Sequence, residues 1–176
     1  MTRRLRGLLA AALCGLFASP AGAGDGGGVF VGRAADLLQL GAGAFAAVKQ
    51  RDRPDRAGEG RIEYRSGFTV WHVGPLAGLM VNSNGGVFAY VALYLDIRIG
   101  PWTLTPAFGG GYYGKGKGKE LGGEAEFHGG LDLGYRLANG HRLGVKVTHV
   151  SNGNTQERNP GTESVLLTWS VPLRFD

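Results

Sequence analysis

The stretch Val-Phe-Ala-Tyr-Val-Ala-Leu-Tyr-Leu-Asp-Ile-Arg-Ile, residues 87–99, decides the fold. Every second residue from Val87 to Ile99 is aliphatic, and the residues between them include two tyrosines, an aspartate and an arginine. This alternation is typical of a β-strand, because successive side chains of a strand point to opposite faces. The sequence therefore predicts a strand with one continuously apolar face.

A second alternating stretch, residues 123–137, indicates what the other face contacts. Its polar positions fall on one strand face: Glu124, Glu126, His128, Asp132 and Arg136. So many charges on one face argue for a polar interior, and the apolar face then points outward, as in a membrane barrel. The alternative is a soluble β-barrel or sandwich, which rarely leaves whole strand faces both apolar and outward.

Eight segments of this kind follow one another along the chain. The predicted strands cover residues 36–49, 59–66, 73–82, 86–99, 102–113, 123–137, 141–151 and 163–175. Eight strands make the smallest outer-membrane barrels, and side chains just fill an interior of that size. The fold class predicted is all-β, an eight-stranded antiparallel transmembrane β-barrel of the outer membrane. Short periplasmic turns such as Ala138-Asn139-Gly140 would alternate with longer extracellular loops.

The N-terminus has the pattern of a secretory signal. Three arginines within the first six residues precede an apolar run over residues 8–17 and the small residues Ala21-Gly22-Ala23. The apolar run is shorter than the roughly 20 residues that a membrane-spanning helix needs. We expect residues 1–23 to be a cleaved signal peptide and residues 24–176 to be a single barrel domain at the cell outer membrane.

The charge balance changes once the signal is set aside. The whole chain has 19 basic and 14 acidic residues, a net charge of +5. Residues 1–23 contain three of the arginines and no acid, so the mature chain would carry only +2. This small excess excludes nucleic acid as an expected partner. Cys14, the single cysteine, also lies in the signal, which leaves no disulfide in the mature chain.

A candidate catalytic group lies at the ends of the last two predicted strands. The stretch His149-Val150-Ser151-Asn152 ends one strand, and Glu163 begins the next. His149 and Ser151 are two residues apart, so their side chains project from the same face about 7 Å apart. On the next strand, alternate residues again share a face, so Glu163 lies on the same apolar face as Val165 and Leu167. A hydroxyl, an imidazole and a carboxylate are the parts of a serine-type acyl hydrolase.

The roles follow from the chemistry of each group. Ser151 would attack an ester carbonyl, His149 would accept and return the proton, and Glu163 would orient the imidazole. Glu157 is a second possible acid, but its mid-loop position makes Glu163 the preferred one. Oxyanion donors or supporting residues would come from Asn152, Asn154, Asn159 and loop N–H groups. The mechanism needs no metal and no organic cofactor, and His72, His128 and His141 lack metal-ligand spacing.

The apolar face that carries the three groups predicts a lipid substrate. A single histidine or serine at a strand end is usually an interfacial or capping residue, and a lone glutamate is usually a solvated charge. Three such groups together on a face that contacts lipid indicate a functional site, because placing polar side chains against lipid costs free energy.

The pattern resembles the lipid A 3-O-deacylase family. The resemblance rests on His149-x-Ser151-Asn152 followed by Asn159, Gly161 and Glu163, within residues 141–175. It implies an outer-membrane barrel that hydrolyses the ester-linked hydroxyacyl chain at position 3 of lipid A, the membrane anchor of lipopolysaccharide. It also implies His149, Ser151 and Glu163 as the triad, with Asn152 and Asn159 supporting it or forming the oxyanion hole. One departure is Asp176, because such barrels commonly end on an aromatic residue such as Phe175.

Two other functions remain open from the sequence. The same barrel could act as an outer-membrane phospholipase or as an acyltransferase. Only the resemblance favours water, rather than a second lipid, as the group that accepts the acyl chain. It could also be a non-enzymatic structural or adhesive barrel whose three polar residues form a rim. The expected partners are lipid A or lipopolysaccharide and other outer-membrane lipids, and a homodimer is possible.

Overall fold

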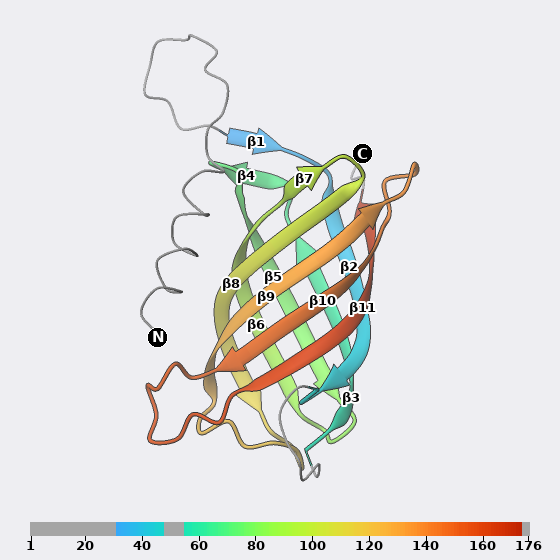
Figure 1. Ribbon diagram of the computed structural model, residues 1–176. Helices are drawn as coiled ribbons and strands as arrows, with labels where there is room; N and C mark the ends of the chain where they lie inside the picture. The colour runs from blue at the N-terminus through green and yellow to red at the C-terminus, as the bar shows by residue number, and fades with distance from the viewer. Residues whose placement is uncertain (1–30, 48–54, 174–176) are drawn as a thin grey trace, which may run out of the picture.

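The computed structural model describes residues 31–47 and 55–173, which form a closed antiparallel β-barrel (Figure 1). The long strands are β2 (Asp36–Phe45), β3 (Ala57–Arg65), β5 (Val73–Asn82), β6 (Val87–Leu95), β8 (Trp102–Gly114), β9 (Ala125–Arg136), β10 (Arg142–Ser151) and β11 (Thr162–Leu173). Each pairs with the next, and β11 pairs with β2 to close the sheet. The predicted eight-stranded fold is confirmed. None of the described residues forms a helix long and apolar enough to span a membrane.

Three short strands were not predicted as separate elements. They are β1 (Val31–Arg33), β4 (Phe68–Val70) and β7 (Ile97–Ile99). β1 pairs with β4, and β7 pairs with β8. The single strand predicted for residues 86–99 is wrong at Asp96, where β6 ends before β7 begins. At this break the Asp96 carboxylate accepts hydrogen bonds from Thr105 Oγ1 and Arg142 Nη1, both at 2.7 Å.

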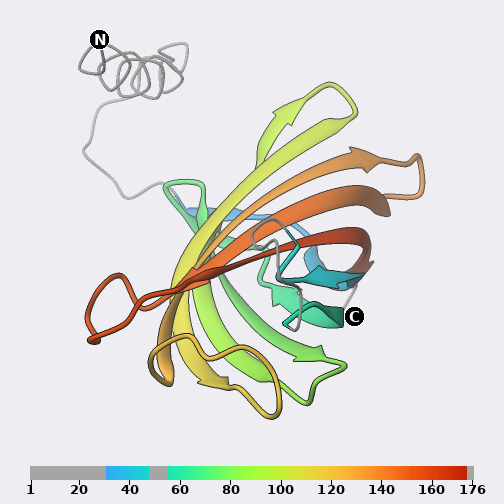
Figure 2. The ribbon, with the colours of Figure 1, turned by 60° about the horizontal axis from the view of Figure 1, so that its bottom comes forward.

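The barrel has two different ends. The terminal end carries the three short strands, the start of β2 and the end of β11. The loop end carries the longer connections 115–124 and 152–161, and it comes forward in Figure 2. The predicted tight turn after β9 is confirmed at the terminal end: Leu137 N donates to His141 O at 2.8 Å, and Gly140 has φ +85°.

The outer surface is apolar along most of its height. On β9 the outward residues Phe127, Leu131, Leu133 and Tyr135 are between 42% and 48% exposed, as the alternation predicts. Trp71, Trp102 and Trp169 are exposed near the terminal end, as in an interfacial belt. Tyr113, by contrast, points inward: it is buried, and its hydroxyl donates to Lys119 O at 2.9 Å.

The interior is a polar network closed by apolar side chains toward the loop end. Glu63 on β3 pairs with Lys146 on β10, and it also accepts hydrogen bonds from Arg65 and Tyr90. Arg65 in turn reaches Asp132 on β9 at 2.8 Å. The apolar cluster beyond this network includes Phe45, Met80, Phe88, Tyr113, Leu121 and Val150. The interior is therefore packed, and the polar face predicted from β9 is confirmed.

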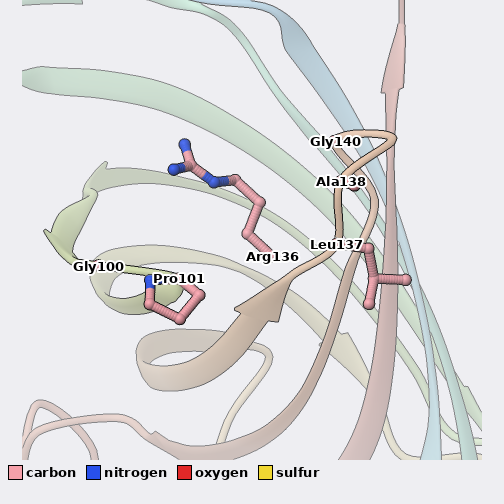
Figure 3. A pocket seen from close by; sticks show the side chains of 6 residues that line it. All are labelled: Gly100, Pro101, Arg136, Leu137, Ala138 and Gly140. Carbon is pink, nitrogen blue, oxygen red and sulfur yellow. The ribbon is translucent and has the colours of Figure 1, made fainter.

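One pocket opens at the terminal end, with a volume of about 490 Å³ (Figure 3). It lies between the β7–β8 turn, which supplies Gly100 and Pro101, and the end of β9, which supplies Arg136. The predicted catalytic group is at the opposite end of the barrel, so this pocket is not part of the candidate site.

Candidate active site

His149 and Glu163 face each other across two neighbouring strands at the loop end. They are direct partners in the register of β10 and β11, which explains how residues fourteen positions apart come together. The Nδ1 atom of His149 lies 3.3 Å from Glu163 Oε1. The two side chains are 53% and 20% exposed, so both are accessible from the outer surface. A carboxylate that accepts the Nδ1 proton leaves Nε2 as the basic nitrogen.

Ser151 ends β10 beside His149, and Gly161 shows how the two side chains are arranged. A Cβ atom placed on Gly161 would lie 3.6 Å from Ser151 Cβ and 3.6 Å from His149 Nε2. The basic nitrogen and the serine side chain therefore border the same small volume. Gly161 has φ +58°, a left-handed conformation that favours glycine. Its proximity to both groups was missed in the sequence, where Asn-Pro-Gly indicates only a turn.

The side chain of Asn152 forms hydrogen bonds with two connections of the loop end. Its side chain is completely buried, and its Nδ2 atom donates to Leu121 O at 3.0 Å and to Arg158 O at 2.7 Å. Its Oδ1 atom accepts the backbone N–H of Asn154 at 3.0 Å. The side chain is thus hydrogen-bonded at every donor position and joins connection 115–124 to connection 152–161.

The other two predicted asparagines complete this network. Asn159 Oδ1 accepts the backbone N–H of Asn152 at 3.2 Å. Asn159 Nδ2 donates to Asn154 Oδ1 at 3.0 Å. These contacts stabilise the connection that begins directly after Ser151. Glu157, the other possible acid, lies exposed within the same connection.

Replacing Asn152 by alanine is expected to loosen connection 152–161 while the barrel stays folded. The variant loses three hydrogen bonds, one buried and two partly buried, each contributing about 1 kcal/mol, and leaves the carbonyls of Leu121 and Arg158 without this partner. Trypsin should then cleave after Arg158 at least about tenfold faster than in the wild-type protein, since local opening governs cleavage. Equal cleavage rates for the two proteins would show that Asn152 does not hold the connection.

Charged residues on connection 115–124 pair with each other rather than with the candidate site. Lys115 Nζ lies 2.7 Å from Glu120 Oε2, and Gly122 N donates to Glu120 Oε1 at 3.2 Å. These hydrogen bonds lower the pKa of the Glu120 carboxyl, which keeps it ionised beside Lys115. Lys119, by contrast, is almost fully buried.

The remaining histidines do not gather around a common point in the described part of the chain. His128 is buried against the Tyr90 ring, with centroids 4.3 Å apart, and His141 accepts a hydrogen bond from Trp169 Nε1 at 3.1 Å. Among residues 31–47 and 55–173, no three histidine, cysteine or acidic side chains are placed to hold a metal ion.

The sequence model of the lipid A 3-O-deacylase family (PagL) matches residues 39–172. The chain belongs to this family. A characterised relative is the lipid A deacylase PagL of Pseudomonas aeruginosa, which is 30% identical over 115 residues. That match covers 61% of this chain and 62% of the length of the relative.

Solved structures support the barrel. The crystal structure of the outer membrane enzyme PagL superposes with a TM-score of 0.59 at 18% identity, covering 78% of this chain and 99% of that one. The crystal structure of Neisserial surface protein A superposes with a TM-score of 0.55 at 10% identity, covering 81% and 99%. At such low identities the likeness shows the fold, an outer-membrane β-barrel.

Proposed function

We propose that this chain hydrolyses the ester that joins a hydroxyacyl chain to position 3 of lipid A. The observation that carries the proposal is the contact between His149 and Glu163 on the outer face of the barrel, beside Ser151. Family membership supplies the substrate and the position of the ester. The geometry supports the reaction type, because a hydroxyl next to an oriented imidazole is an activated nucleophile.

The proposed reaction has two steps. Ser151 Oγ attacks the ester carbonyl while His149 Nε2 takes the serine proton, and Glu163 stabilises the resulting imidazolium. The tetrahedral intermediate collapses, the C–O bond to the sugar breaks, and His149 returns the proton to the departing 3-hydroxyl. Water, deprotonated by His149, then attacks the acyl-serine, which releases the hydroxy fatty acid and restores Ser151.

The backbone N–H of Gly153 is the proposed oxyanion donor, because the N–H groups of Asn152 and Asn154 already donate to Asn159 Oδ1 and Asn152 Oδ1. Gly153 and Asn154 have φ values of +62° and +65°, which turn the chain sharply next to the serine. Each well-placed donor contributes about 3 kcal/mol to transition-state stabilisation. Because the side chain of Asn152 is engaged with Leu121 and Arg158, we assign it the supporting role, together with Asn154 and Asn159.

The location of the three groups favours a membrane lipid as substrate. Val147 and Val165, the outward neighbours of His149 and Glu163 on their strands, are 46% and 37% exposed. Apolar side chains of the interior cluster close the barrel near this end, so a substrate reaches Ser151 from the side. We therefore propose that the loop end lies at the outer leaflet. Export would be directed by residues 1–23, which lie outside the described residues. A homodimer stays a prediction.

A product analysis with purified protein separates the candidate functions. The protein in detergent is incubated with lipid A and, separately, with a diacyl phospholipid, and the products are identified by mass spectrometry. We expect lipid A to lose one hydroxyacyl chain as free acid while the phospholipid stays intact. Lysophospholipid would indicate a phospholipase, an acylated acceptor lipid would indicate an acyltransferase, and intact lipids throughout would indicate a structural barrel.

A further inference from the structure

Three arginines gather at the terminal end of the barrel, away from the candidate active site. Arg136 at the end of β9 is the direct register partner of Arg142 at the start of β10. Arg98 on β7 pairs with the buried Thr103 of β8, so it has inward parity. Figure 3 shows the side chains of Arg136 and Leu137 pointing to opposite sides of the chain. The three arginines therefore lie around the mouth of the barrel interior.

All three arginines line one cavity of about 240 Å³, and none of the described residues that line it is acidic. Asp96 accepts a hydrogen bond from Arg142 Nη1 at 2.7 Å and so balances one of the charges. Asp36, an acid at the same end, is not part of the cavity lining. Arg98 and Arg136 are exposed, and their side chains form no ion pair within the described part of the chain. The cavity therefore keeps an excess of two positive charges.

Arg142 also brings an unsatisfied hydrogen-bond donor to this cavity. Its side chain is only 9% exposed, and its Nε atom is buried without a hydrogen-bond partner among the described residues. A buried N–H group without a partner costs free energy, so in folded proteins such a group is normally satisfied by a bound molecule. Asn139 lines the same cavity, and its Oδ1 atom accepts the backbone N–H of His141 at 3.1 Å. Its Nδ2 group is then a neutral donor beside the charged ones.

The charge and the size of the cavity indicate which anion it fits. Guanidinium groups bind phosphate and carboxylate, because two of their N–H groups match two oxygens at once. An excess of two positive charges matches a phosphate monoester, which carries about −1.5 to −2 at neutral pH, better than a carboxylate with a single charge. The cavity is smaller than the roughly 300–1,000 Å³ of most ligand sites, so it suits one chemical group. The pocket of about 490 Å³ in Figure 3 shares Arg136 and Gly140 with it and has room for the rest of the ligand.

We propose that Arg98, Arg136 and Arg142 form a phosphate site at the terminal end of the barrel, which binds the phosphate monoester of a small solute or of a lipid headgroup. The phosphate neutralises Arg98 and Arg136, and the buried Nε of Arg142 gains the acceptor that it lacks in the protein alone. The site is independent of the proposed hydrolysis, because Ser151 lies at the loop end. Binding to the folded barrel also stabilises it against unfolding.

Calorimetric titration of the purified full chain tests the phosphate site. The protein in uncharged detergent at low salt is titrated with glycerol 3-phosphate and, separately, with dioctanoyl phosphatidic acid, which presents the same monoester on a lipid. The variants are Arg98→Gln and Arg136→Gln, both at exposed positions where the loss of charge should not unfold the barrel. Arg158→Gln is the matched control, because it removes the same charge from an exposed position at the loop end.

The wild-type chain should bind at least one of the two monoesters, and Arg98→Gln and Arg136→Gln should each raise its Kd by about tenfold or more. Arg158→Gln should leave the Kd unchanged. Binding of both compounds with similar Kd values would indicate a soluble ligand, and tighter binding of phosphatidic acid would indicate a lipid headgroup; either result supports the site. The phosphate site is overturned if the wild type binds neither compound, if both terminal-end variants bind like the wild type, or if Arg158→Gln weakens binding as much as they do.

Discussion

Replacing His149 by glutamine is expected to lower kcat for lipid A deacylation by about 10⁴- to 10⁶-fold, as in other serine hydrolases that lose their base. Glutamine keeps a side chain of similar polarity but cannot accept the proton of Ser151 at neutral pH. Without proton transfer the serine hydroxyl is a weak nucleophile. The measurement is kcat of purified protein in detergent, with free hydroxy fatty acid quantified over time.

His141→Gln is the matched control for this variant. His141 lies at the terminal end, where its Nδ1 atom accepts a hydrogen bond from Trp169 Nε1. Its replacement removes a histidine from the outer surface without touching the candidate site, so kcat should stay within about twofold of the wild type. A loss in His149→Gln that is no larger than the loss in His141→Gln would remove His149 from the mechanism.

Replacing Glu63 by leucine is expected to destabilise the barrel by about 3–5 kcal/mol. Glu63 is almost fully buried, and it pairs with Lys146 from across the barrel and with Arg65 from its own strand. The substitution removes the carboxylate and leaves the buried Lys146 ammonium without this counter-charge. The free energy of unfolding can be measured from tryptophan fluorescence during guanidinium titration in detergent.

A double variant separates the lost charge pair from the lost volume. Glu63→Leu combined with Lys146→Leu removes both charges, so no uncompensated ammonium remains, and it should recover most of the stability lost by Glu63→Leu alone. If the stability lost by the double variant equalled the sum of the losses in Glu63→Leu and Lys146→Leu, the broken ion pair would not be the cause of the destabilisation. Neither residue contacts Ser151, and folded protein should keep its activity.

Alternation in the sequence was sufficient for the barrel because lipid outside and a polar network inside impose opposite demands on neighbouring residues. The stretch 87–99 shows both the success and the failure of this reasoning. Its outward aliphatic residues were identified correctly, yet the break at Asp96 was not, because alternation continues through it. At the break, the Asp96 side chain bonds to Arg142 and Thr105, which are contributed by other strands and leave no local signal.

Alternation predicted part of the candidate site in the same way. Parity alone placed His149 and Glu163 on one face, and the structure adds that they are direct partners in register. The hydrogen-bond partners of Asn152 could not be predicted, since one of them is Leu121, a residue in a different connection. The proximity of Gly161 to Ser151 and His149 was equally hidden, because only folding of connection 152–161 brings these residues together.

The central claim is that Ser151 is the nucleophile of a lipid A 3-O-deacylase, and mass spectrometry of lipid A tests it most directly. Lipid A is extracted from Gram-negative cells that lack their own deacylase and express the wild-type chain, Ser151→Ala or Ser83→Ala. Ser83 is a loop-end serine that accepts a hydrogen bond from Gly58 N at 3.1 Å, so its variant is the matched control. Lipid A should lose one hydroxyacyl chain with the wild type and Ser83→Ala, and stay intact with Ser151→Ala. Intact lipid A with folded wild-type protein, or continued deacylation by Ser151→Ala, would contradict the account.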